Sequence, residues 1–269
     1  MRALSKLPAA TAKSLRGIIF DLDGTVLTDG ALTLEAYSAL HTLRDSGLRL
    51  IACTGRPAGW GEVIQRQWPI DLAVTENGAV SFHSISSDGV DSRVQRIDRI
   101  DEDQRQARRE RLLAIVGELA ERFGDVQLAD DNHSRQSDVT FDIGEHCQVA
   151  PERVAEICRA AEELGARTFE SSILLHITLD TDDKASGTLH AMSQAFDEDP
   201  SAALTRYAFV GDSANDEACF SAFRTTLAVR NVTPHLARLT VAPGYGSTRD
   251  AGKGFAEIAE LLLFLREAA

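Results

Sequence analysis

The chain lacks long apolar stretches and is poor in cysteine. None of its segments approaches the roughly 20 consecutive apolar residues that cross a bilayer, so we expect no membrane partner. The cysteines have no paired spacing, which argues against a disulfide framework and against a zinc site. We therefore expect a reduced, cytoplasmic protein. The four cysteines are Cys53, Cys147, Cys158 and Cys219.

Positive charge is also scarce. The 269 residues include 28 Lys and Arg against 41 Asp and Glu, which gives a formal net charge of -13. A surface with this excess of negative charge disfavours binding to nucleic acid or to anionic membranes. An anionic substrate would need cations placed locally at its site.

The first 15 residues show no apolar core followed by a cleavage site. They include Lys6 and Lys13, so we expect a loosely ordered leader and no signal peptide. The rest of the composition, with 43% hydrophobic and 26% charged residues, is ordinary for a globular chain of one or two domains.

One stretch, residues 17–25, stands out because a short apolar run ends at two carboxylates and a glycine. The run is too short for a helix and predicts a buried strand. Asp21 and Asp23 are alternate residues, so in extended geometry both side chains start on one face. Like charges this close repel unless a cation lies between them or one keeps its proton. The alternative is that both residues only form a turn after the strand.

Strands and amphipathic helices alternate on both sides of the middle of the chain. This order predicts an α/β fold with a doubly wound, Rossmann-like parallel sheet, built from residues 1–82 and 183–269. Asn77 and Gly78 give a strong hairpin signal. The expected strands are 17–20, 48–53, 72–74, 207–210, 226–229 and 239–241, and the expected helices are 33–46, 57–67, 185–196, 217–223 and 254–266.

The middle of the chain, residues 83–182, has a different pattern. Helices alternate there with pairs of strands, which predicts an inserted α+β cap domain with an antiparallel sheet. The expected strands are 90–97, 139–143, 147–149, 166–169 and 173–179, and the expected helices are 104–123 and 151–164.

Four separated groups of polar residues follow apolar strands or begin helices. They are Asp21 with Asp23, Thr54, Lys184, and Asp212 with Asn215 and Asp216. A parallel sheet would bring them together at one edge. Phosphoryl transfer needs such a set: a nucleophile, carboxylates for magnesium, a lysine for the charge of the transferring group, and hydroxyl or amide donors.

These motifs, in this order, resemble those of the haloacid dehalogenase superfamily over nearly the whole chain. The resemblance implies that Asp21 is the nucleophile that forms an aspartyl-phosphate and that Asp23 is the acid/base. The second aspartate favours phosphate chemistry over dehalogenation, because an alcohol leaving group needs a proton. The matching segments are Asp21-Leu22-Asp23-Gly24-Thr25, Thr54, Lys184 and Gly211-Asp212-Ser213-Ala214-Asn215-Asp216.

The resemblance also implies a phosphate and metal site. Thr54 and Lys184 would hold the phosphoryl group. Mg²⁺ would be bound by Asp21, Asp212 and the backbone carbonyl of Asp23, with Asp216 supporting the site.

The position of the insertion, between Thr54 and Lys184, resembles the type IIB cap. Members with this cap include the Cof-type sugar phosphatases and the sucrose, trehalose-phosphate and mannosyl-3-phosphoglycerate phosphatases. The segments Thr54-Gly55-Arg56 and Glu76-Asn77-Gly78-Ala79 also resemble that branch. The chain departs from many members after Lys184, where it reads Ala185-Ser186-Gly187-Thr188-Leu189 in place of Gly-x-Ala-Leu, so the start of this helix is open.

Further candidates for contact with the phosphate or the leaving group carry alternatives. Arg56 could instead form a local salt bridge, and Asn77 could only form a turn. In the cap, Arg135 could neutralise the acidic segment before it, and His176 could be a core residue. The core candidates are Gly55, Arg56, Asn77, Ser213 and Asn215, and the cap candidates are His133, Arg135, Ser171, Ser172 and His176.

The resulting expectation is a Mg²⁺-dependent phosphatase for a small phosphorylated metabolite, such as a sugar or a glycoside. The resemblance is nearest to the mannosyl-3-phosphoglycerate branch. One alternative is a sugar phosphomutase that uses the same aspartate. Another is a catalytically silent protein that binds a phosphorylated ligand. The sequence leaves the substrate and the oligomeric state open.

Overall fold

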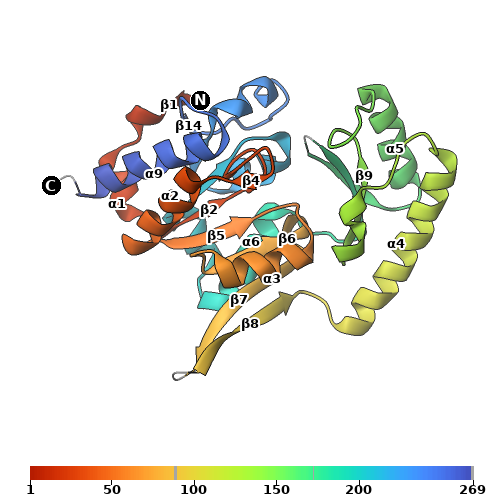
Figure 1. Ribbon diagram of the computed structural model, residues 1–269, viewed down its shortest axis with the longest axis horizontal. Helices are drawn as coiled ribbons and strands as arrows, with labels where there is room; N and C mark the ends of the chain where they lie inside the picture. Colours follow the sequence, from red (N-terminus) through yellow and green to blue (C-terminus); the bar gives the residue numbers. More distant parts are fainter. Residues whose placement is uncertain (88–89, 172, 268–269) are drawn as a thin grey trace.

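The computed structural model describes residues 1–87, 90–171 and 173–267 (Figure 1). Its main feature is a nine-stranded sheet in the order β1-β14-β13-β12-β2-β5-β6-β7-β8. In this order, each strand is parallel to the next one as far as β6. The last two pairs, β6 with β7 and β7 with β8, are antiparallel. The strands are β1 (Arg2–Ala3), β2 (Gly17–Phe20), β5 (Arg49–Cys53), β6 (Leu72–Thr75), β7 (Val80–Ser87), β8 (Val90–Asp98), β12 (Tyr207–Gly211), β13 (Thr225–Ala228) and β14 (Tyr245–Gly246).

Helices cover both faces of this sheet. Side chains alternate along β2, so Ile18 and Phe20 pack on one face and Ile19 on the other. Each such fully buried side chain contributes about 1.5–3 kcal/mol. One face carries α1 (Ala9–Ser14), α2 (Leu34–Asp45), α3 (Ala58–Gln67) and α9 (Ala251–Glu267), and the other carries α6 (Lys184–Phe196), α7 (Pro200–Arg206) and α8 (Glu217–Ala222).

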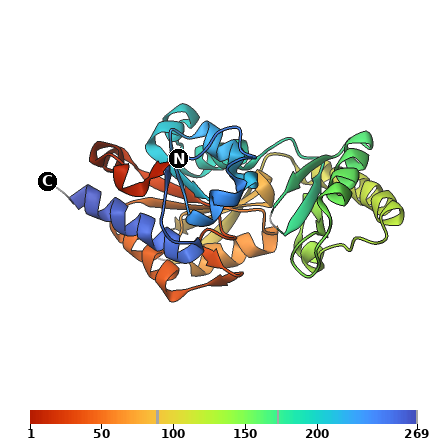
Figure 2. The ribbon, with the colours of Figure 1, turned by 90° about the horizontal axis from the view of Figure 1, so that it is seen from above.

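A second, smaller unit lies at one end of this core. Its antiparallel sheet has the order β10-β11-β9 and packs against two helices around one apolar cluster. Figures 1 and 2 show its sheet toward the core and its helices on the far side. Its elements are α4 (Glu102–Arg122), β9 (Asp138–Asp142), α5 (Pro151–Glu163), β10 (Arg167–Glu170) and β11 (Leu174–Thr178).

The remaining elements are short. A small antiparallel ribbon directly follows residues 21–25, and single 3₁₀ turns link several of the longer elements. They are β3 (Leu27–Thr28), β4 (Ala31–Leu32), η1 (Leu4–Lys6), η2 (Glu76–Gly78), η3 (Asp130–Ser134), η4 (Ala214–Asp216) and η5 (Arg230–His235).

The architecture confirms the predicted α/β core with an inserted α+β cap. The place where the cap begins differs from the expectation of residue 83. Strands β7 and β8 extend the core sheet as far as Asp98. We therefore propose that the cap spans residues 99–182.

The expectation of a loosely ordered leader is wrong. Residues 2–14 form β1, η1 and α1. Their apolar side chains Leu4, Leu7 and Ala12 are buried in the same cluster as those of α9. The apolar positions are too few and too irregularly spaced to form a recognisable pattern in the sequence.

Two predicted short strands are absent from the described structure, and one helix was not predicted. Residues 147–149 are not a strand, and the Asp142 carboxylate just before them accepts the backbone N–H groups of Gly144, Glu145 and His146 in a turn. Residues 239–241 are not a strand either, and they follow the turn at residues 236–238. Helix α7, which was not predicted, has only seven residues and begins after the capping side chain of Asp199. Within the described residues, no helix combines the length and the apolar character that a membrane crossing requires.

Two glycines within helices should respond in opposite ways to replacement by alanine. A Cβ at Gly187 in α6 would overlap backbone atoms of Gly78, whereas a Cβ at Gly117 in α4 meets no atom within 4 Å beyond its own helix. We expect Gly117→Ala to raise the free energy of unfolding by about 0.5–1 kcal/mol. Gly187→Ala should lower it by about 1–3 kcal/mol. Urea unfolding of the three proteins measures both, and equal effects would contradict this packing.

Candidate active site

The candidate site lies at the carboxyl ends of two neighbouring parallel strands. Strand β2 is hydrogen-bonded to β5 on one side and to β12 on the other. The chain forms β5 and β6 on the first side and adds β12 on the second side only after the cap, so the strand order reverses at β2. Such a switch point is where open α/β sheets form their ligand crevice. Asp21 follows β2 and its backbone N–H donates to the carbonyl of Val210 at 2.9 Å. Asp212 follows β12 directly.

A buried lysine links two carboxylates of this site. Lys184 is the first residue of α6, and the Asp183 side chain caps this helix. The Lys184 Nζ lies 2.7 Å from Asp21 Oδ1 and 2.7 Å from Asp216 Oδ1. The sequence left the start of this helix open, and the structure places it at Lys184. The Lys184 ammonium thereby lies between Asp21 and Asp216.

Asp216 fixes the loop after β12 through its second oxygen. Asp216 Oδ2 accepts the backbone N–H of Asp212 at 2.9 Å and that of Ser213 at 3.1 Å. Both of its oxygens therefore have protein donors, and the side chain is fully buried. This contact pattern suits a residue that supports the site.

Asp212 has two donors that sequence reasoning did not single out. Thr25 Oγ1 donates to Asp212 Oδ1 at 3.2 Å, and Asn231 Nδ2 donates to Asp212 Oδ2 at 2.7 Å. Asn231 also donates to the carbonyl of Gly24 at 2.9 Å. Gly24 has a φ of 74°, and a Cβ there would overlap Asp212 Oδ2. Thr25 stands in the first motif and could have been suspected, whereas no pattern marks Asn231.

The charges of this site do not balance. Asp21, Asp212 and Asp216 share one lysine. Burial raises the pKa of Asp21 to about 7, and it also raises the pKa of Asp212 well above its usual range. Neighbouring carboxylates add to both shifts, and Lys184 opposes them. Burial alone would lower the pKa of Lys184, but Asp21 and Asp216 outweigh it and raise that pKa.

The three carboxylates fit a divalent cation. Each offers an oxygen within 4.8 Å of the others' oxygens, and all three residues are buried. Magnesium prefers such oxygen ligands and keeps some of its waters. Asp216 is the least available of the three, since its Oδ1 accepts the Lys184 ammonium and its Oδ2 accepts two backbone N–H groups. We therefore expect Asp21 and Asp212 to hold the ion. A cation there would relieve the repulsion that raises the pKa values.

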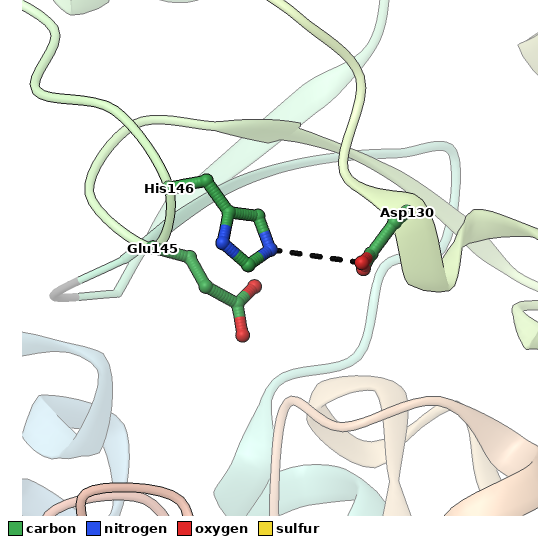
Figure 3. Close-up of side chains that lie close together, drawn as sticks. All are labelled: Asp130, Glu145 and His146. Carbon is green, nitrogen blue, oxygen red and sulfur yellow. Dashed lines mark ion pairs between the residues drawn. The ribbon is translucent and has the colours of Figure 1, made fainter.

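A second group of potential ligands in the described part of the chain differs from the first in its exposure. Asp130, Glu145 and His146 lie together on the surface of the cap, and His146 Nε2 is 3.6 Å from Asp130 Oδ2 (Figure 3). All three are exposed. Water screens their charges, so this group creates no comparable need for a cation.

Asp23 forms an ion pair with the arginine that follows the second motif. Arg56 Nε donates to Asp23 Oδ2 at 2.8 Å and Nη2 donates to Oδ1 at 2.6 Å. The guanidinium also lies over the Trp60 ring, 4.5 Å from its centroid. Thr54 Oγ1 accepts the Arg56 backbone N–H at 3.0 Å, so the second motif shapes this loop. The salt-bridge alternative for Arg56 therefore holds in this structure.

Asn77 is more than a turn residue. Its φ is 54°, which favours asparagine in a tight turn. Its Oδ1 also accepts the Asn215 Nδ2 donor at 2.9 Å, which connects the turn after β6 to the loop after β12. A Cβ at Gly55 would lie 3.2 Å from the same oxygen, so a glycine allows the second-motif loop to approach.

A cavity joins the core residues to the cap. Of the cap candidates, Arg135, Ser171 and His176 line it. His133 is exposed and bonds the carbonyl of Asp130 instead, and Ser172 lies outside the described residues. The cavity is lined by Asp21, Asp23, Gly55, Arg56, Arg135, Ser171, Ile173, Leu174, His176, Lys184, Ser213 and Asn215.

Arg135 and His176 are both held inside the cap. Arg135 donates to both carboxylate oxygens of Asp131 and to those of Asp138, and its side chain is fully buried. His176 Nδ1 lies 2.7 Å from Asp138 Oδ2. Arg135 thus neutralises the acidic segment before it, which was the alternative to contact with the substrate. His176, in contrast, lines the cavity.

Comparison with known proteins agrees with this arrangement. Residues 18–103 match the family model of haloacid dehalogenase-like hydrolases. A search of curated proteins found no match. A protein of Thermoplasma acidophilum shares the fold at 17% identity with a TM-score of 0.70, over 93% of this chain and 98% of its own.

Two further solved structures share the fold. Sucrose-phosphatase from Synechocystis sp. PCC6803 has 18% identity and a TM-score of 0.65, over 92% of this chain and 98% of its own. The subclass IIB sugar phosphatase BT4131 has 16% identity and a TM-score of 0.62, over 93% of this chain and 99% of its own. The family model confirms the resemblance to haloacid dehalogenase-like hydrolases over residues 18–103, and the three solved structures confirm the fold.

Magnesium should stabilise the fold through the buried carboxylates and not through the exposed group on the cap. We expect saturating Mg²⁺, at about 100 times its dissociation constant, to raise the free energy of unfolding by about 2.7 kcal/mol. Asp212→Asn should abolish this increase, and Asp130→Asn should leave it intact. Thermal unfolding with Mg²⁺ and with chelator measures both, and an increase that is lost only in Asp130→Asn would refute the assignment.

The raised pKa of Asp21 predicts how stability changes with pH when the cation is removed. A carboxyl group with a pKa of about 7 in the folded state and about 3.9 in the unfolded state binds its proton more tightly when folded. The folded state is therefore favoured at low pH and loses this advantage as the pH rises from about 4 to 7. In chelator, the stability of the wild type relative to Asp21→Asn should fall over this range, by at most about 1.4 kcal/mol per pH unit. A difference that does not change with pH would contradict the shift.

Proposed function

We propose that this chain is a Mg²⁺-dependent phosphatase that hydrolyses the phosphate monoester of a small sugar or glycoside. The observation that carries the proposal is the placement of Asp21 at the switch point of the sheet. There it contacts Lys184, lies close enough to Asp212 and Asp216 to share a cation with them, and lines a cavity shared with the cap. A nucleophile, a charge-neutralising lysine and a cation site on one face of a cavity are the parts that phosphoryl transfer needs.

In the first step, an oxygen of the Asp21 carboxylate attacks phosphorus, and the bond from phosphorus to the sugar oxygen breaks. Asp23 gives its proton to that leaving oxygen. Lys184 offsets negative charge on Asp21 and on the transferring group, since its Nζ is 2.7 Å from Asp21 Oδ1. Mg²⁺, held by Asp21 and Asp212, would supply further positive charge at the phosphate.

In the second step, a water molecule gives a proton to Asp23 and attacks the phosphorus of the aspartyl-phosphate. The bond from phosphorus to the Asp21 oxygen breaks, which releases inorganic phosphate and restores the Asp21 carboxylate. In this structure the Arg56 guanidinium donates to both carboxylate oxygens of Asp23. The first step uses the acid form. We infer that the incoming phosphate draws the Arg56 guanidinium away from Asp23.

The lining of the cavity favours a neutral leaving group. Its cations Arg56, Arg135 and Lys184 each have a carboxylate partner within the protein. The cap adds hydroxyl, imidazole and apolar surface through Ser171, His176 and two aliphatic side chains. This surface suits a sugar. A phosphoglycerate would bring a second anionic group, and each cation among the described lining residues already has a carboxylate partner. The names of the two sugar phosphatases with the same fold support the sugar class.

Phosphate release tests the proposal. The panel comprises glucose 6-phosphate, sucrose 6-phosphate, trehalose 6-phosphate and mannosyl-3-phosphoglycerate, each with Mg²⁺ and with chelator. We expect Mg²⁺-dependent turnover of a neutral sugar phosphate, and a loss of about 10³-fold or more in Asp21→Asn. Asp23→Asn should lower kcat/KM for the sugar phosphate by about 10²–10⁴-fold. For p-nitrophenyl phosphate the loss should be smaller, because that leaving group needs no proton.

Several results would overturn the proposal. Isomerised sugar phosphate that appears only with a catalytic amount of a sugar bisphosphate would identify a phosphomutase. Binding of a sugar phosphate without release would identify a silent binding protein. Preferred turnover of mannosyl-3-phosphoglycerate would refute the neutral leaving group while leaving the chemistry intact. Asp130→Asn, on the exposed surface of the cap, is the control and should match the wild type.

A further inference from the structure

One carboxylate outside the proposed chemistry connects the core to the cap. Glu76 belongs to the turn after β6 and is buried. Its Oε1 accepts the backbone N–H of Ala58 in the core at 2.8 Å and that of Gln136 in the cap at 3.0 Å. Its Oε2 accepts Ser137 twice, from the backbone N–H at 2.6 Å and from Oγ at 2.7 Å, and it accepts the backbone N–H of Asp138 at 3.3 Å.

The backbone at this turn is held in an uncommon conformation. Glu76 and Asn77 are consecutive non-glycine residues with φ of 48° and 54°. Such conformations each cost of order 1–3 kcal/mol and persist only where the surroundings fix them. Here the backbone N–H of Glu76 donates to the carbonyl of Arg56, and that of Asn77 donates to the carbonyl of Thr54. The turn is thus tied to the second-motif loop while its carboxylate points to the cap.

The same turn contacts the other parts of the site through its next two residues. Asn77 accepts the side-chain amide of Asn215 in the loop after β12. A Cβ at Gly78 would overlap the carbonyl oxygen of Asp183, directly before Lys184. Three consecutive residues therefore touch the cap, the loop of Asp212 and the start of the helix that carries Lys184.

The cap segment that Glu76 binds also leads to the cavity. Arg135, the residue before Gln136, donates to the carbonyl of Gly55 at 3.0 Å. Asp138, at the other end of the segment, bonds His176, and the ring of His176 lines the cavity opposite Gly55. A carboxylate that receives only N–H and O–H donors is well suited to fix such a segment, because each bond to a charged acceptor is strong.

We propose that Glu76 is a positioning residue that docks cap residues 135–138 on the second-motif loop and so fixes His176 over Asp21 and Asp23. The proposal rests on the proposed function, in that the cap is taken to contact the leaving group of the substrate. Glu76 itself does not line the cavity. Its carboxylate acts through the cap segment, and a substrate that is too short to reach the cap does not need it.

The first test follows the docking itself and needs no substrate. In Glu76→Gln the side chain keeps its shape but turns an NH₂ group toward N–H donors. We expect the amides of residues 136–138 to exchange hydrogen at least about tenfold faster than in the wild type. Exchange in α9 should not change, which separates local undocking from loss of the whole fold. The control is Glu62→Gln, an exposed residue of α3 whose carboxylate bonds Arg66.

The second test separates positioning from a general structural role. Acetyl phosphate can phosphorylate Asp21 without contact with the cap. We expect Glu76→Gln to lower kcat/KM for the best sugar phosphate by about 10–100-fold and for acetyl phosphate by less than about threefold. Equal losses for both substrates would overturn the proposal, as would unchanged amide exchange. Should Glu76→Gln not fold, Ser137→Ala removes one contact from the cap side, and a smaller loss confined to the sugar phosphate is expected.

The two proposals fail in different ways. If the wild type releases phosphate from no compound, the proposed function fails, and amide exchange still decides whether Glu76 docks the cap. If sugar phosphates are hydrolysed and Glu76→Gln behaves like Glu62→Gln, the positioning role fails and the phosphatase stands.

Discussion

The arrangement of the site follows from one constraint, which is that three buried carboxylates share one buried ammonium. Lys184 is within 2.7 Å of Asp21 and of Asp216, yet it cannot balance them and Asp212 together. Buried charge of one sign is tolerated only with partners, donors or protons. Asp212 and Asp216 are accordingly hydrogen-bonded to several donors from the side chains and the backbone. It also keeps two carboxylates available to a divalent cation. The electrostatic imbalance that makes this part of the structure costly is what makes it suitable for a divalent cation.

The fold determines how these groups meet. Residues separated by nearly 200 positions become neighbours because β2 and β12 pair in parallel and both end at the same edge. Close approach of the backbone completes the arrangement. Gly24 allows Asp212 to lie against the first-motif turn, and Gly187 allows α6 to pack against the turn after β6. Lys184 can reach both carboxylates because its helix begins so close to that turn.

Most of the core and its site could be predicted, because both depend on local patterns. The strand before Asp21 is apolar and short, and its carboxylates stand directly at its end. The same holds for Asp212. Asn231 and Glu76 could not be found this way, since their roles arise from contacts across the fold. The start of the cap is harder to predict, because alternation of apolar and polar residues indicates strands but not which sheet they join, and β7 and β8 join the core sheet. Helix α1 could not be predicted because its apolar side chains are buried only by packing against α9, at the far end of the chain.

The cap shows why charged residues alone are poor guides to substrate recognition. Arg135 had the right chemistry to bind an anion, yet its guanidinium is used entirely on Asp131, Asp138 and the carbonyl of Gly55. A buried ion pair of this kind adds little net stability but is expensive to break. It therefore suits a segment that must take one position and keep it. Glu76 provides the complementary contact from the core, so charges at the interface of core and cap define where the cap lies. Under the proposed function, a neutral leaving group would be recognised by the hydroxyl, imidazole and aliphatic groups with which the cap lines the cavity.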